Sequence, residues 1–152
     1  MEAHVYEGKM KPILVVFGTR PEWIKIKPLL KSFKSNEIPF KIARIRQHGE
    51  LLEQTDPDIG ENLFECVPIQ KGDMFVDRLS HLGSEILRQM SQMLYSDFNS
   101  QYSAVLVQGD TASAFYSACA AFQQQVPVIH LEAGLRTYDN LNPYPEEFYR
   151  QG

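Results

Sequence analysis

Three acidic residues stand where a fold could use them for proton transfer. Asp110 and Glu132 come at the ends of apolar runs typical of buried strands, in VLVQGD and VPVIHLE. Glu146 follows the proline-containing stretch NPYP and begins a helical pattern in which Arg150 lies four residues later. A carboxylate held at such a position can act as a general acid or a general base. These three residues are therefore the first candidates for chemistry.

Simpler structural roles are open for the same residues. Asp110 could cap the N-terminus of the helix that follows, although Thr111 could do so instead and leave the aspartate free. Glu146 and Arg150 have the i, i+4 spacing of an ordinary surface ion pair. Glu132 precedes Ala-Gly and has no obvious capping role. The residue pattern alone does not choose between these alternatives.

The turn GTRP, after the apolar run KPILVVF, supplies candidate positive charges. If a helix follows it, the N–H groups of Gly18 and Thr19 lie at the positive end of that helix, which suits a phosphate. Arg20 and Lys25 add cations, and a guanidinium matches phosphate oxygens well. The alternative is that Thr19 caps the helix, Pro21 occupies its first turn and Arg20 is merely solvated.

Together, three carboxylates, two cations and a glycine turn indicate an anionic, phosphate-bearing substrate and proton transfer at carbon. The sequence has neither the Walker spacing nor the GxGxxG dinucleotide motif. A serine nucleophile lacks its GxSxG elbow, and no His/Cys cluster or regular Asp spacing indicates a metal site. His130 lies within the last apolar run, one face of which must be buried, so we expect a neutral, hydrogen-bonded core histidine.

Strand-like and helix-like patterns alternate along the chain, which predicts a parallel sheet with helices on both faces, joined by right-handed crossovers. The fold class is therefore a Rossmann-like α/β domain. Ligands of such sheets bind beyond the carboxyl ends of the strands, so we expect the candidate residues to gather along one edge. Strands are expected at residues 11–17, 40–45, 62–67, 104–107 and 126–131, and helices at 22–35 (with a kink or short first segment at Pro28), 48–54 (one or two turns), 74–98 and 111–124.

Composition narrows the functional classes. The chain has 152 residues, 43% hydrophobic residues and a net charge of −4, which suit one globular domain and argue against a general nucleic-acid binder. No apolar run is long enough for a membrane span, and two cysteines suggest a reducing, cytoplasmic setting. Residues 1–10 read as a disordered or tag-like tail and 11–152 as the domain. The sequence stops inside a helical pattern, so we expect a fragment that lacks a second domain.

Five segments give the chain a family resemblance: FGTRPEWIKIKPL, RQHGELL, VLVQGDTASAFYSACAAF, VPVIHLEAGLRTYD and NPYPEEFYRQ. Together they resemble the non-hydrolysing UDP-N-acetylglucosamine 2-epimerases. The resemblance implies the N-terminal half of a glycosyltransferase-B type fold, whose sugar nucleotide lies between two Rossmann-like domains. It implies reversible conversion of UDP-GlcNAc to UDP-ManNAc by elimination and re-addition of UDP, without NAD or an obligatory metal. It also implies a homodimeric whole protein that serves polysaccharide biosynthesis.

The resemblance assigns catalytic roles to five positions, three acid–base carboxylates and two cations: Asp110, Glu132, Glu146, Arg20 and Lys25. It adds four substrate contacts, Gly18, Thr19, Arg136 and Arg150, and a second, regulatory UDP-GlcNAc site at Gln47 and His48. On this basis we expect Asp110 to point into a reaction cleft rather than to cap its helix.

Half of such a site is missing from the sequence, so we expect the chain alone to be inactive. A non-catalytic sugar-nucleotide binding or regulatory module is the alternative function. A further alternative is an epimerase for a modified UDP-HexNAc.

Overall fold

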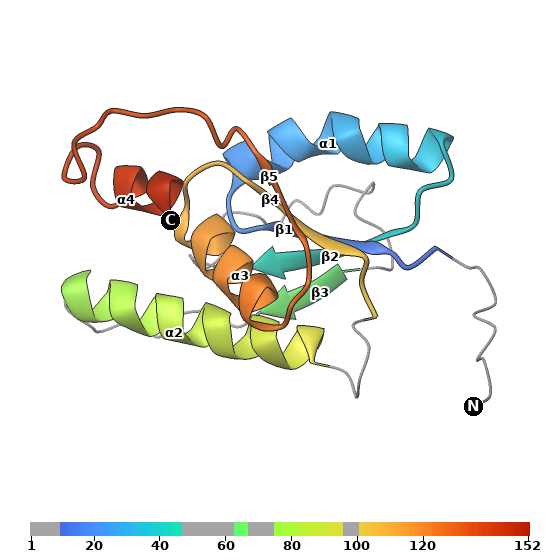
Figure 1. Cartoon of the computed structure of the whole chain (residues 1–152), viewed down its shortest axis with the longest axis horizontal. Coiled ribbons are helices and arrows are strands. Elements are labelled where there is room, and N and C mark those ends of the chain that lie inside the picture. The colour runs from blue at the N-terminus through green and yellow to red at the C-terminus, as the bar shows by residue number, and fades with distance from the viewer. Residues whose placement is uncertain (1–9, 47–62, 67–74, 96–100) are drawn as a thin grey trace.

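A computed structural model describes residues 10–46, 63–66, 75–95 and 101–152, and within them five parallel strands form one sheet (Figure 1). The strand order is β3-β2-β1-β4-β5. The strands are β1 (Ile13–Phe17), β2 (Phe40–Ile45), β3 (Leu63–Cys66), β4 (Ala104–Gln108) and β5 (Val128–Leu131). The helices are α1 (Arg20–Ser35), α2 (Phe75–Leu94), α3 (Ala112–Gln123) and α4 (Glu146–Gln151). The predicted Rossmann-like fold class is confirmed.

The apolar runs of β1, β2 and β4 are largely buried because helices cover both faces of the sheet. Alternate residues of β1 point to opposite sides: Val15 packs in the cluster that contains α1, and Leu14 packs in the cluster that contains α2 and α3. Val15 lies in register with Ile42 of β2 and Leu106 of β4, which belong to the same cluster. Figure 1 shows α1 on one side of the sheet and α2 with α3 on the other.

Most predicted boundaries agree with the structure to within three residues. The strand predicted at 40–45 is observed as predicted, whereas the long helix predicted at 74–98 ends at Leu94. The short first segment that Pro28 suggested is wrong, because α1 is one helix of 16 residues that includes the exposed Pro28. The tail over residues 1–9 and the helical turns expected at 48–54 lie outside the described residues.

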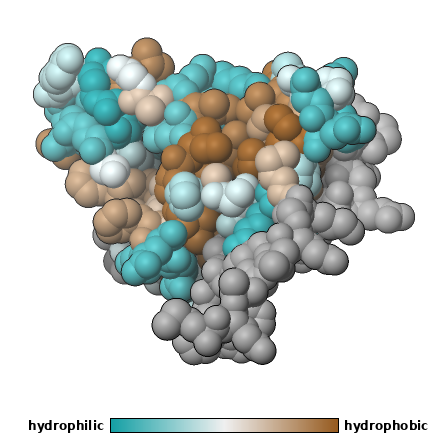
Figure 2. Space-filling view, turned by 45° about the vertical axis from the view of Figure 1, so that its right-hand side comes forward, coloured by the Kyte–Doolittle hydropathy of each residue, from teal (hydrophilic) through white to brown (hydrophobic). Residues whose placement is uncertain are grey.

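The sheet ends at β5, with no strand on its far side among the residues described. Val128 and Ile129 of β5, and Phe122 of α3, are exposed apolar residues. A space-filling view shows hydrophobic residues gathered over the middle of one face, with hydrophilic residues around them (Figure 2). An unpaired strand edge with exposed apolar residues beside it is a surface on which additional protein can pack. None of the helices in the described ranges has the length and apolar character that a membrane crossing requires.

Helices α2 and α3 meet closely at Gly83. A Cβ added there would lie 2.3 Å from Cζ of Tyr116, so the tyrosine ring would have to move away. Tyr116 belongs to an aromatic cluster that continues through Phe115 and Tyr149, whose rings are stacked with centroids 5.0 Å apart. This cluster joins α3 to α4, so the packing at Gly83 also supports the helix that carries Arg150.

We predict that Gly83→Ala lowers the free energy of unfolding by about 1–3 kcal/mol, because the added methyl group overpacks the contact with Tyr116. On helix propensity alone the same change would stabilise the protein by about 1 kcal/mol. Chemical denaturation followed by far-UV circular dichroism measures the difference. Ser84→Ala, at the exposed neighbouring position, is the control and should change stability by less than about 0.5 kcal/mol. A stabilised Gly83→Ala protein would contradict the close packing.

Candidate functional site

The carboxyl ends of β1, β4 and β5 lie side by side because these strands are neighbours and parallel. The turns after β1 and β4 lead into α1 and α3, and the residues after β5 begin a long loop that ends at α4 (Figure 1). Gly109 N–H donates to the carbonyl of Leu131 at 3.0 Å, and Nε2 of His130 lies 2.6 Å from the carbonyl oxygen of Gly109. The predicted hydrogen bonding of His130 is confirmed, although its side chain is only half-buried.

Asp110 does not cap α3. Thr111 is the N-cap residue, and its Oγ1 accepts a hydrogen bond from the N–H of Ala114 at 3.2 Å. The carboxylate of Asp110 instead accepts from Nε of Arg150 at 2.6 Å and is also paired with Nη2 of that residue. The side chains of this ion pair are 25% and 15% exposed. A predicted catalytic residue, Asp110, and a predicted substrate-binding residue, Arg150, 40 positions apart in the sequence, are therefore in direct contact.

Glu147 holds Arg150 from the other side. It is fully buried and accepts hydrogen bonds from Nη1 of Arg150 at 3.2 Å, from Nε2 of Gln151 at 3.0 Å and from the N–H of Tyr138 at 3.1 Å. Burial raises the pKa of Glu147, but these donors outweigh it and bring the pKa down from 4.5 to about 2. From the sequence, Glu146 was the expected site residue of this helix, and Glu147 was not expected. The i, i+3 spacing of Glu147 from Arg150 is the signal that could have identified it.

Glu132 forms a second ion pair at the same edge. Its Oε2 lies 2.5 Å from Nζ of Lys25 and also accepts a hydrogen bond from the side-chain amide of Gln108, the last residue of β4. The backbone of Glu132 has a φ of +58°, a left-handed conformation that costs a non-glycine residue energy. Residues with such strained backbone conformations are concentrated at active sites and ligand-binding sites. Sequence reasoning missed Gln108 because it looked like the end of a buried strand.

In the turn after β1, the N–H groups of Gly18 and Thr19 are not free to bind a phosphate. The N–H groups of Gly18 and Thr19 donate to Oε2 of Glu22 at 2.8 and 2.6 Å, and Thr19 Oγ1 accepts from Glu22 N–H at 3.4 Å. These bonds form a capping box, in which the helix start is satisfied by its own residues. The prediction that the N–H groups of Gly18 and Thr19 bind phosphate is therefore not supported, and the capping alternative for Thr19 is confirmed.

The remaining predicted residues differ in their availability. Arg20 is exposed and Glu146 half-buried, and neither side chain has a hydrogen-bond or ion-pair partner among the described residues. Arg136 is exposed and donates through Nη1 to the carbonyls of Ala133 and Leu135, within its own loop. Among the described residues, Arg136 forms no hydrogen bond or salt bridge with the side chains of the two ion pairs. Gln47 and His48 lie outside the described residues.

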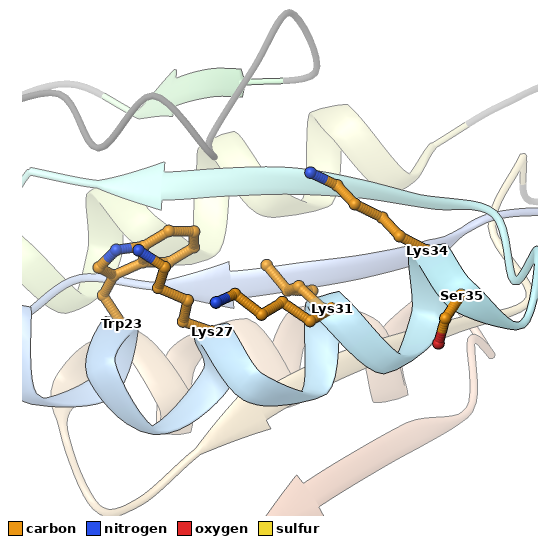
Figure 3. A pocket seen from close by; sticks show the side chains of 6 residues that line it. Trp23, Lys27, Lys31, Lys34 and Ser35 are labelled. Carbon is orange, nitrogen blue, oxygen red and sulfur yellow. The ribbon is translucent and has the colours of Figure 1, made fainter.

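A pocket of about 400 Å³ runs along α1, but it is a separate feature (Figure 3). Its walls include Trp23 and the lysines at 27, 31 and 34. None of the predicted acid–base residues lines it. The candidate site is therefore the open edge that carries the two ion pairs.

This edge combines carboxylates with cations, which is what proton transfer on an anionic substrate requires. Asp110 and Glu132 are each oriented by a cation, and orientation by a rigid scaffold favours acid–base catalysis. Arg20 offers a guanidinium to an anionic ligand. No group of three or more His, Cys, Asp or Glu side chains within the described ranges has an arrangement that could hold a metal ion.

Comparisons with known proteins point to one family. A family model described as UDP-N-acetylglucosamine 2-epimerase matches residues 50–152. The UDP-N-acetylglucosamine 2-epimerase of Campylobacter jejuni is 40% identical over 145 residues, which cover 93% of this chain and 36% of that protein. The Neisseria meningitidis enzyme of the same name is 39% identical over 145 residues, covering 91% and 36%. The chain thus spans about a third of the length of these curated relatives.

Solved structures agree with this match. A putative UDP-N-acetylglucosamine 2-epimerase from Listeria monocytogenes superposes with a TM-score of 0.79 at 32% identity, covering 95% of this chain and 37% of that one. The Neisseria meningitidis enzyme bound to UDP-GlcNAc gives a TM-score of 0.77 at 34% identity, covering 92% and 37%. The sheet described above is the N-terminal part of the glycosyltransferase-B type fold of these proteins.

We predict that Glu147→Gln flattens the loss of stability in acid. Because the pKa of Glu147 is about 2 in the folded protein and 4.5 ordinarily, its contribution is present above about pH 4.5 and is lost as the pH falls towards 2. Unfolding midpoints measured across this pH range in wild type and variant test this. Glu37→Gln, which removes an exposed carboxylate elsewhere, controls for the change in net charge. Parallel curves for wild type and Glu147→Gln would show that this network does not hold Glu147 ionised.

Proposed function

The chain belongs to the UDP-N-acetylglucosamine 2-epimerase family, and on that premise we propose that it supplies the acid–base side of a site that interconverts UDP-GlcNAc and UDP-ManNAc. The curated relatives are nearly three times as long as the segment that matches. We propose that further protein contributes the rest of the site. The proposed substrate is a UDP-sugar, and the proposed reaction is an isomerisation at C2 of its hexosamine ring.

The reaction requires a base and cations, and residues at the carboxyl ends of β1, β4 and β5 can supply both. The C2 proton is weakly acidic, so a positioned base has to remove it while UDP leaves from C1. The departing diphosphate gains negative charge, which cations stabilise. UDP then adds back after a proton is delivered to the opposite face of C2. We assign proton transfer to Asp110, Glu132 and Glu146, and diphosphate contacts to Arg20, Lys25 and Arg150, without dividing the steps among them.

The observation that carries this proposal is the pair of ion pairs at one edge of the sheet. Asp110 with Arg150, and Glu132 with Lys25, join residues that are 40 and 107 positions apart. Each pair joins one proposed acid–base group to one proposed cation. Both follow neighbouring parallel strands, so they lie where ligands of open parallel sheets bind.

Other features of the whole protein stay predictions. The UDP-GlcNAc-binding regulatory role of Gln47 and His48, the homodimer and the cytoplasmic setting are proposed from the family resemblance and from composition. A non-catalytic binding module and an epimerase for a modified UDP-HexNAc are the competing functions. Activity on UDP-GlcNAc separates the proposed function from both of these alternatives.

A chimera provides the test of activity. We expect a protein in which this chain replaces the matching 145 residues of the Campylobacter jejuni relative to convert UDP-GlcNAc and to exchange the C2 proton for deuterium in heavy water. Asp110→Asn in this chimera should lower the rate about 10²–10⁴-fold, because the variant lacks a carboxylate for proton transfer. Proton NMR of the sugar nucleotide measures conversion and exchange together.

Asp139→Asn is the matched control, since Asp139 is exposed and its Oδ1, which accepts from Leu141 N–H, is retained in asparagine. It should leave the rate within about twofold. An Asp110→Asn chimera as active as wild type would remove Asp110 from the mechanism. Deuterium exchange catalysed by the 152-residue chain alone would show that the additional protein is not needed for the first step.

A further inference from the structure

Glu22 is a buried carboxylate that none of the proposed chemical steps uses. Only 2% of the residue is exposed. Its Oε2 accepts the N–H groups of Gly18 and Thr19, as described above. Its other oxygen, Oε1, accepts a hydrogen bond from the hydroxyl of Thr111 at 2.6 Å, across 89 residues of sequence. One side chain therefore holds the turn after β1 and the turn after β4 together.

The contact with Thr111 is more specific than helix capping requires. A capping box uses the glutamate only to accept the N–H of its own N-cap residue. Here the hydroxyl of Thr111 accepts from Ala114 N–H, which caps α3, and at the same time donates to Glu22. A hydroxyl has one proton to donate, so the position of Glu22 orients the hydroxyl that caps the second helix. The starts of α1 and α3 are thus fixed to each other by a single hydrogen bond between side chains.

The residues beside this hydrogen bond are those that the proposed function uses. Arg20 lies next to Thr19 in the first turn of α1, and Asp110 lies next to Thr111. We propose that Glu22, through Thr111, is a positioning residue that fixes the distance between Arg20 and Asp110 for the reaction. This inference rests on the proposed function. It adds that the geometry of the site depends on a carboxylate that does not touch the substrate.

The kinetic consequence follows from the need for alignment. A displacement of about 1 Å between reacting groups can lower a rate about 10²-fold while the substrate still binds. In the active chimera we therefore expect Glu22→Gln and Thr111→Val each to lower kcat about 10- to 100-fold and to change KM for UDP-GlcNAc by less than about threefold. Thr111→Ser, which keeps a hydroxyl for both hydrogen bonds, should restore kcat.

A double variant distinguishes positioning from two separate structural defects. If the contact acts as a unit, Glu22→Gln combined with Thr111→Val lowers kcat no further than the stronger single variant. The proposal would be overturned if the fold-losses in kcat of the two single variants multiplied in the double variant. It would also be overturned if the variants raised KM and left kcat unchanged. Asp110→Asn in the same chimera distinguishes failure of the positioning role from failure of the proposed function. If Asp110→Asn abolishes activity but Glu22→Gln does not, only the positioning role of Glu22 is overturned. An Asp110→Asn chimera that keeps activity overturns the proposed function.

A measurement on the 152-residue chain tests the contact without activity. In Glu22→Ala, amide hydrogen exchange at residues 109–114 should accelerate at least about tenfold, because the capping hydroxyl of Thr111 loses its acceptor. Exchange in the distant helix α2 should not change, and Glu37→Gln, which alters an exposed carboxylate instead of a buried one, should leave both segments as in wild type. Unchanged protection of residues 109–114 in Glu22→Ala would overturn the inference.

Discussion

The parallel direction of β1, β4 and β5 is the constraint on which the rest of the structure depends. Parallel strands that are neighbours end at the same edge, so the turns that follow them meet there. Every long-range polar contact of the candidate site uses this edge. Lys25 meets Glu132, and Thr111 meets Glu22, because the helices after β1 and β4 begin at this edge. An antiparallel arrangement of the same segments would place these groups at opposite ends of the sheet.

Carboxylates at this edge divide into two classes by burial. Glu22 and Glu147 are buried and surrounded by donors, and each fixes a helix start or a cation. Asp110 and Glu132 are partly exposed and each pairs with one cation, so they remain accessible to a ligand. A buried carboxylate needs its full set of hydrogen bonds to offset the loss of water. The buried members therefore provide rigidity, and the exposed members can exchange their partners for substrate.

Much of the fold could be predicted from apolar patterning. The strands at 40–45 and 104–108 are continuous apolar or alternating runs, and burial between helices leaves little freedom in where they begin and end. The sequence also selected Asp110, Glu132, Lys25 and Arg150, which the structure brings together in pairs. Prediction from the sequence was wrong where a hydrogen-bonding group had two possible partners. The N–H groups of Gly18 and Thr19 suited a phosphate equally well, but Glu22 occupies them.

The order and types of residues were enough to establish a parallel α/β domain with charged turns at one edge, because hydrophobic periodicity and strand-to-helix alternation are local properties of the chain. They could not establish which carboxylate is structural and which is available. That choice depends on whether Thr111 or Asp110 caps α3, on the donors that surround Glu147, and on the contact of Glu22 with a residue 89 positions away. Such hydrogen bonds form between segments that meet only after folding, when burial removes water as the competing partner.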